Sequence, residues 1–122
     1  MGTKQYNLPE DERPREKLIR DPSGKSLSDA EFIAILLNTG TVGCPVSELA
    51  HRLLCAFPSL EEFINSDWQA MKTRVAEWNE KHPENPIKGA ADAKLLRLAA
   101  AFQFVRRVQS RISADDFRTA NA

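Results

Sequence analysis

A short stretch with a lysine on either side of a predicted helix start has the residue types that bind phosphate. Lys88 and Gly89 directly precede a long Ala- and Leu-rich segment that opens at about Ala90. The first turn of a helix carries unpaired N–H groups and the positive end of the helix dipole, and a preceding glycine lets an anion approach the backbone closely. We therefore predict a contact to the phosphate backbone of nucleic acid here. The predicted contact residues are Lys88, Gly89, Ala90, Ala91, Lys94 and Arg97.

The same stretch also has a purely structural interpretation. Asp92 would lie in the first turn, where its carboxylate suits the helix dipole but repels a phosphate. A glycine loop followed by a capped helix needs no ligand, so both interpretations stay open. If phosphate is bound, the contact carries no sequence information, and DNA binding would be weak, sequence-independent and sensitive to salt.

The residues that catalysis or metal binding would need are sparse. The chain has two histidines, His51 and His82. His51 is one helical turn from Glu48 and from Cys55, and these three side chains suit part of a metal site or a nucleophile pair. A fourth ligand is not evident, and a regular helix surface offers neither a cleft nor an oxyanion hole. We therefore expect no catalytic residue, no metal, no cofactor and no small-molecule substrate.

Composition and charge narrow the class of protein. The 122 residues carry 17 basic and 17 acidic side chains, and 42% are apolar, which is ordinary for one globular domain. Residues 84–111 are the exception, with six basic and two acidic side chains. A polyanion would therefore dock near the last predicted helix, although a solvated helix face explains the same charges. Two cysteines and no apparent signal or membrane-spanning segment predict reduced thiols in the cytoplasm.

The pattern of apolar residues predicts an all-α protein of five or six helices. Helices are expected over about 13–20, 29–37, 45–57, 60–65, 67–81 and 90–111. Boxes of the form Ser-x-x-Glu or Ser-x-x-Gln at Ser28, Ser59 and Ser66 predict three of the helix starts, and Gly40 is suited to a left-handed C-cap. We expect a flexible lead-in over 1–8, a compact helical bundle over 9–111 and a flexible tail over 112–122.

The last predicted helix is apolar beyond one face. Its apolar side chains cover most of its circumference and include Phe102, Phe104, Val105 and Val108. A helix that is apolar all round is typical of a central core helix. If Phe104 and Val108 are exposed instead, a surface for a protein partner is favoured, such as a second copy of the chain.

Three blocks of the sequence resemble the N-terminal domain of the bacterial RadC family. They are Leu8–Leu18 (LPEDERPREKL), Leu27–Gly43 (LSDAEFIAILLNTGTVG) and Val46–Ala50 (VSELA). The order and spacing match over about residues 8–60, and the Ile87-Lys88-Gly89 hairpin with its following helix matches more loosely to about Arg107.

The resemblance implies a small helical domain with a helix-hairpin-helix-like C-terminal part, in a family labelled as DNA repair proteins. It also implies that family members have a C-terminal half similar to JAB/MPN metalloprotease-like domains, whose His-x-His zinc motif does not occur in this chain. The alternative function is therefore a protein-interaction or scaffolding domain that docks such a C-terminal domain or another subunit. Two departures from the family pattern remove phosphate-binding features. Val42 and Cys44 stand where the family loop usually has basic residues, and Gly89-Ala90-Ala91 replaces a Gly-Ile-Gly hairpin.

Overall fold

The computed structural model describes residues 13–88 and 91–120, which form six α-helices and no strand. The all-α prediction is therefore confirmed for this part of the chain. The helices are α2 (Pro14–Arg20), α3 (Asp29–Leu37), α4 (Val46–Ala56), α5 (Leu60–Asn65), α6 (Trp68–Lys81) and α7 (Asp92–Ala120). Within the described residues, none of these helices has both the length and the apolar content needed to cross a lipid bilayer. The expected lead-in over 1–8 lies outside the described residues.

Side-chain caps explain where three helices begin. Ser28 accepts from the backbone N–H of Glu31, whose carboxylate accepts from the N–H of Ser28, so the predicted capping box at α3 is confirmed. Ser59 caps α5 through the N–H of Glu62. The prediction for α6 is wrong by one residue. Asp67 is the cap and accepts from Ala70 N–H, because the hydroxyl of Ser66 donates instead to the carbonyl of Glu62.

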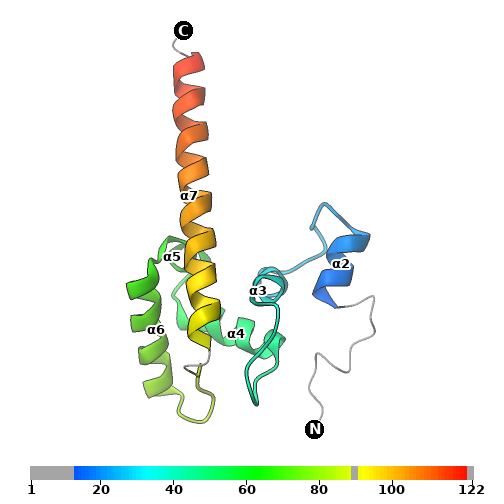
Figure 1. The fold of residues 1–122 in the computed structure, drawn as a ribbon, viewed down its shortest axis with the longest axis vertical. Coiled ribbons are helices and arrows are strands. Elements are labelled where there is room, and N and C mark those ends of the chain that lie inside the picture. The colour runs from blue at the N-terminus through cyan, green and yellow to red at the C-terminus, as the bar shows by residue number, and fades with distance from the viewer. Residues whose placement is uncertain (1–12, 89–90, 121–122) are drawn as a thin grey trace.

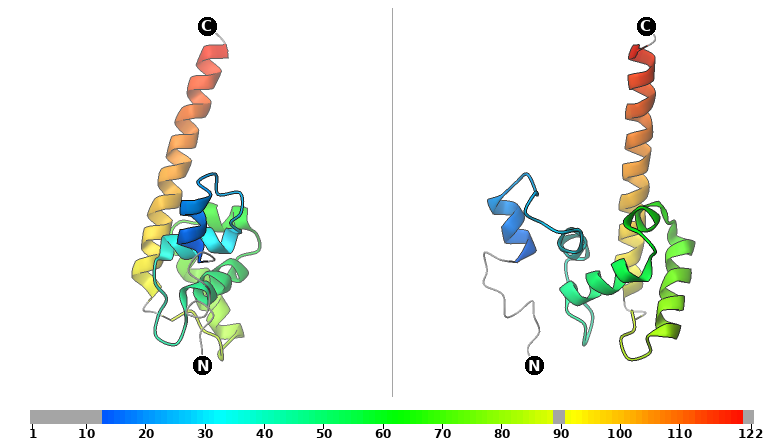
Figure 2. Two further views of the ribbon diagram at one scale, coloured as in Figure 1. Left: turned by 90° about the vertical axis from the view of Figure 1, so that its right-hand side faces the viewer. Right: turned by 180° about the vertical axis from the view of Figure 1, so that it is seen from behind.

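The core lies where α7 passes α3, α4, α5 and α6. In Figures 1 and 2, α2, α3, α7 and α6 follow one another across the molecule, and α4 runs from beside the lower part of α7 to below α3. The largest fully buried side chains are Phe63, Leu37, Leu49, Leu53, Met71, Ile87, Leu95 and Leu98. Phe63 of α5 packs between the end of α4 and α7. Its ring centroid lies 4.5 Å from that of Phe57 and 5.2 Å, edge-on, from that of Phe102. Aromatic and aliphatic packing thus fixes the lower part of α7.

Helix α2 is held against α3 by one ion pair and one close apolar contact. Lys17 Nζ lies 2.8 Å from a carboxylate oxygen of Glu31. Gly24 has a φ of +74°, and a Cβ there would come within 2.9 Å of the ring of Phe32. A glycine is therefore required for both its backbone angle and its small size, and it lets the turn after α2 lie against α3.

Helix α7 is longer than the sequence pattern indicated. It continues to Ala120, whereas we expected it to end near Arg111 and to be followed by a flexible tail. Residues 112–120 contain no glycine or proline, so nothing in the backbone chemistry stops the helix there. In Figures 1 and 2 this upper part of α7 rises beyond the other helices.

Candidate nucleic-acid interface

The loop between α3 and α4 turns tightly, and its backbone is crowded at Gly40. Thr41 and Cys44 exchange two backbone hydrogen bonds of 2.9 Å. A Cβ at Gly40 would lie 2.1 Å from the carbonyl oxygen of Cys44, so no side chain fits there. The left-handed residue after α3 is Asn38, with a φ of 70°, rather than Gly40 as predicted from the sequence. Asparagine tolerates a positive φ better than most side chains. Gly40 is needed instead because the backbone of Cys44 lies too close to leave room for a side chain.

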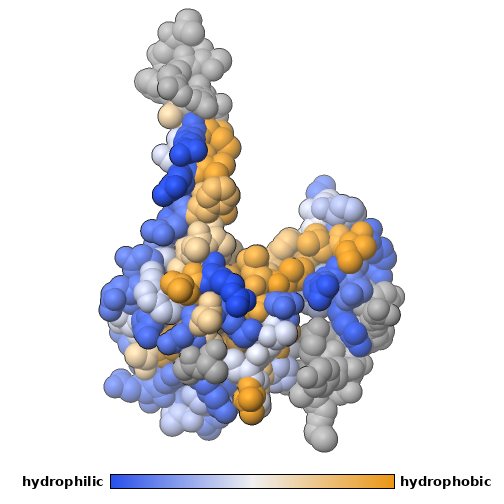
Figure 3. Space-filling model, in the orientation of Figure 1, coloured by the Kyte–Doolittle hydropathy of each residue, from blue (hydrophilic) through white to orange (hydrophobic). Residues whose placement is uncertain are grey.

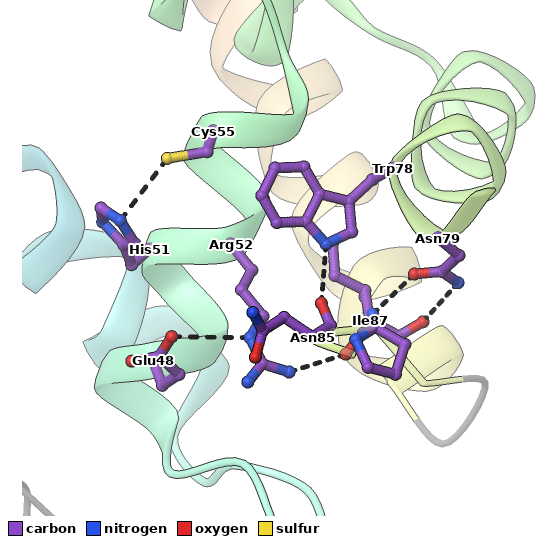
Figure 4. Close-up of polar contacts among 9 residues, drawn as sticks. Glu48, His51, Arg52, Cys55, Trp78, Asn79, Asn85 and Ile87 are labelled. Atoms are coloured by element: carbon purple, nitrogen blue, oxygen red, sulfur yellow. Dashed lines mark hydrogen bonds and ion pairs between the residues drawn. The ribbon is translucent and has the colours of Figure 1, made fainter. Parts of the chain in front are cut away.

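A polar network fixes the segment that leads into the predicted phosphate site (Figure 4). Asn79 of α6 accepts from the N–H of Ile87 at 2.7 Å and donates to the carbonyl of the same residue at 2.9 Å. Trp78 donates to the carbonyl of Asn85, and Arg52 of α4 donates to the carbonyl of Pro86 at 2.7 Å. Side chains from two helices therefore satisfy three consecutive residues of this segment and hold Lys88 in place.

Lys88 and Lys94 converge on the α3–α4 loop from two different elements. The ammonium of Lys88 donates to the carbonyl of Val42 at 3.3 Å. The ammonium of Lys94 donates to the hydroxyl of Thr39 at 2.7 Å and to the carbonyl of Leu37 at 3.4 Å. These acceptors are neutral, so they position the two ammonium groups without cancelling their charge.

The remaining predicted contact residues are placed less favourably for phosphate binding. The N–H of Ala91 already donates to the carbonyl of Lys88 at 2.9 Å, and the side chain of Ala91 is fully buried. Arg97 is exposed on α7. Gly89 and Ala90 lie outside the described residues. Asp92 is paired with Lys72 at 3.2 Å, so its carboxylate is partly neutralised beside the site.

Two arginines that the sequence reasoning missed line a cavity on the other side of the same loop. The cavity has a volume of about 590 Å³ and lies between the start of α2 and the loop. Arg13 and Arg15 both line it, together with Glu16, and neither arginine pairs with a carboxylate of the described residues. The signal was the Arg13-Pro14-Arg15 sequence, which we had interpreted only as a helix start.

The two cysteine thiols differ in exposure, since Cys44 is buried and Cys55 is exposed. Burial raises the pKa of the Cys44 thiol, although the charge of Arg52 acts in the opposite direction. Cys44 is therefore protonated at neutral pH and unreactive. Cys55 is exposed, with its Sγ 3.6 Å from Nε2 of His51, which is also exposed. Glu48 interacts with Arg52 rather than orienting His51 in a triad, and within 13–88 and 91–120 no three His, Cys, Asp or Glu side chains form a group that could hold a metal ion.

Comparison with known proteins places the chain in a family. The sequence model described as UPF0758 N-terminal matches residues 6–78, which is more than half of the chain. The chain belongs to the UPF0758 family. A UPF0758 protein of Carboxydothermus hydrogenoformans is 40% identical over 109 residues, covering 88% of this chain and 41% of the relative. A UPF0758 protein of Aliivibrio fischeri strain ES114 is 40% identical over 101 residues, covering 83% of this chain and 39% of the relative.

This UPF0758 chain thus spans about two fifths of the length of these relatives. A second Aliivibrio fischeri relative, from strain MJ11, is 52% identical over 61 residues, covering 50% of this chain and 27% of the relative. No solved structure matches the chain. The match to an N-terminal family region agrees with the blocks at Leu8–Leu18 and Leu27–Gly43 that carried the resemblance described above.

Proposed function

We propose that this UPF0758 domain is a non-catalytic module that binds the phosphate backbone of DNA weakly and without sequence preference. The binding surface is the α3–α4 loop and the cationic side chains around it. The observation that carries the proposal is the convergence of Lys88 and Lys94 on this loop, where both ammonium groups donate to neutral oxygens among the residues that the structure describes. An ammonium group has three donors, so Lys88 keeps two of them for a phosphate and Lys94, which donates to two oxygens, keeps one.

The charges near the loop support the same function. Arg13 and Arg15 add two cations at the cavity on the far side of the loop, against the single carboxylate of Glu16 that also lines it. The nearby acids Asp92 and Glu48 each interact with a basic side chain. Among the described residues around the loop, cations therefore outnumber carboxylates although the whole chain is neutral, and such an excess attracts a polyanion. The resemblance to the RadC family, labelled as DNA repair proteins, points to the same class of ligand.

Fluorescence anisotropy with labelled single- and double-stranded DNA tests this function. Substituting Lys88→Glu together with Lys94→Glu reverses two charges at the loop, and we expect DNA affinity to fall by at least about tenfold, with a shallower salt dependence. The matched control is Lys25→Glu with Lys81→Glu, which makes the same charge change at two exposed positions outside the site. Equal affinities for the two double variants would refute the site.

A second candidate function, protein interaction, is favoured by one specific observation. Phe104 and Val108 are exposed, at 65% and 36% of their surface, which is the condition under which the sequence favoured a partner surface. Such a surface suits docking of a further domain, such as the C-terminal half that the RadC resemblance implies, or of another subunit.

A further inference from the structure

A band of exposed apolar side chains runs along the upper part of α7 and continues over α3 to α2. We call it the apolar notch. Figure 3 shows it on the side of α7 that faces α2, as an inner corner rather than a flat face. Its members are Phe104, Val105, Val108 and Ile112 of α7, Phe32 and Leu36 of α3, and Ile19 of α2. A contiguous exposed apolar surface of this kind marks an interaction site in a small protein.

The helical spacing shows that the α7 part of the notch faces α3. Ile112 follows Lys94 by about five full turns, so the two residues point in the same direction. Lys94 contacts the carbonyl of Leu37 at the end of α3, which fixes that direction. Phe104, Val108 and Ile112 recur every fourth residue along about two turns. A helix lying in the corner can therefore contact both walls of the notch, as in helix-in-groove recognition.

The charge around the notch selects the kind of helix. Residues 93–120 of α7 contain six basic residues, Lys94, Arg97, Arg106, Arg107, Arg111 and Arg118, against two acidic residues, Asp115 and Asp116, so this part of the helix has a net positive charge. Arg106 is directed away from the notch and donates to the carbonyl of Ile64. Arg107 and Arg111 are exposed close to Val108 in sequence. A second copy docked in the notch would bring the same excess of basic residues on its own α7, and a net like charge at an interface is unfavourable.

We propose that the apolar notch binds an amphipathic helix whose apolar face is bordered by acidic side chains. The apolar face covers Phe104, Val108 and Ile112 on one side and Leu36 on the other, and the acidic borders pair with Arg107 and Arg111. This inference specifies the partner for the protein-interaction function and is independent of DNA binding at the loop. The longer UPF0758 relatives carry about three fifths of their length outside the matched region, where such a helix has a place.

Two designed peptides of about 18 residues test the proposal, because that length spans five turns. Both have the same leucine face, and its borders are glutamate in one peptide and lysine in the other. By fluorescence anisotropy with the full chain, we expect the glutamate peptide to bind at least about tenfold more tightly than the lysine peptide. The variant Val108→Glu should lose this binding. The control Leu96→Glu changes an exposed apolar residue about 120° away on α7 and should bind normally.

Circular dichroism checks that both variants fold. Sedimentation across a concentration series distinguishes self-association of the chain from an absence of peptide binding. Self-association of the chain that Val108→Glu abolishes would overturn the acidic-helix proposal while leaving protein interaction intact. A chain that stays monomeric and binds neither peptide would overturn both. Equal binding of the two peptides, or unchanged binding by Val108→Glu, would also contradict the proposal.

Discussion

The two halves of α7 both carry large apolar side chains, but these side chains have opposite surroundings. In the lower half, Leu95, Leu98 and Phe102 are buried against the other helices. In the upper half, Phe104, Val108 and Ile112 are exposed. The lower half has α3, α5 and α6 beside it, and the upper half rises above them (Figure 1). The apolar residues of a helix therefore do not by themselves tell whether it is buried within its own chain.

The strongest expected contrast between the halves is in stability. Leu98→Ala should destabilise the fold by about 3 kcal/mol, because it opens a cavity in a packed site. Val108→Ala should change the free energy of unfolding by less than about 0.5 kcal/mol, because the side chain is not enclosed. Urea unfolding followed by circular dichroism measures both. Similar losses for the two variants would mean that the upper half is packed after all.

The second contrast concerns the hairpin that precedes the lower half. Asn79→Ala removes both polar partners of the buried Ile87 backbone and should destabilise the fold by about 2 kcal/mol. Asn65→Ala removes an exposed hydrogen bond to Glu61 and should stay within about 0.5 kcal/mol. If the hairpin positions Lys88, Asn79→Ala should also weaken DNA binding, whereas Asn65→Ala should not. Denaturant titration and DNA anisotropy on the same two variants distinguish these outcomes.

The smallest expected effect lies at the outer wall of the notch, where α2 meets α3. Burial alone would raise the pKa of Glu31, but its hydrogen bonds with Lys17 and Ser28 outweigh this and hold the pKa below the ordinary 4.5. The resulting stabilisation, at most about 1 kcal/mol, is present above pH 4.5 and is lost as the pH falls through the lowered pKa. Unfolding free energies of Lys17→Met should depend less steeply on pH below 4.5. An unchanged pH profile would show that the ion pair contributes nothing.

Local signals in the sequence predicted most of the helices. The serine at position 28 with glutamate at 31, and the repeat of apolar residues from Val46 to Phe57, involve groups within one or two turns of each other. Such short-range chemistry is readable without the fold. The start of α6 was predicted one residue too early because Ser66 and Asp67 are both good capping residues. Only the hydrogen bond from Ser66 to Glu62 decides between them.

The candidate site was only partly predictable, because it depends on contacts between distant segments. Sequence reasoning identified Lys88 and Lys94 from the helix start, and it gave no indication that Lys88 reaches Val42 or that Lys94 reaches Thr39. Arg13 was missed because its position beside the same loop depends on how α2 packs against α3. Helix dipoles and spacing describe one element at a time, whereas a charged surface is a property of several elements together.

The stacked pair of Trp78 and His82 gives this small domain an optical label of its own. The indole and imidazole rings lie 3.7 Å apart and within 19° of parallel, and the indole N–H is held by the carbonyl of Asn85. Tryptophan emission depends on such neighbours, so opening of the hairpin would change the spectrum without any added dye. The other tryptophan, Trp68, lies at the opposite end of α6 and has the ammonium of Lys72 over its ring, so its signal reports a separate place.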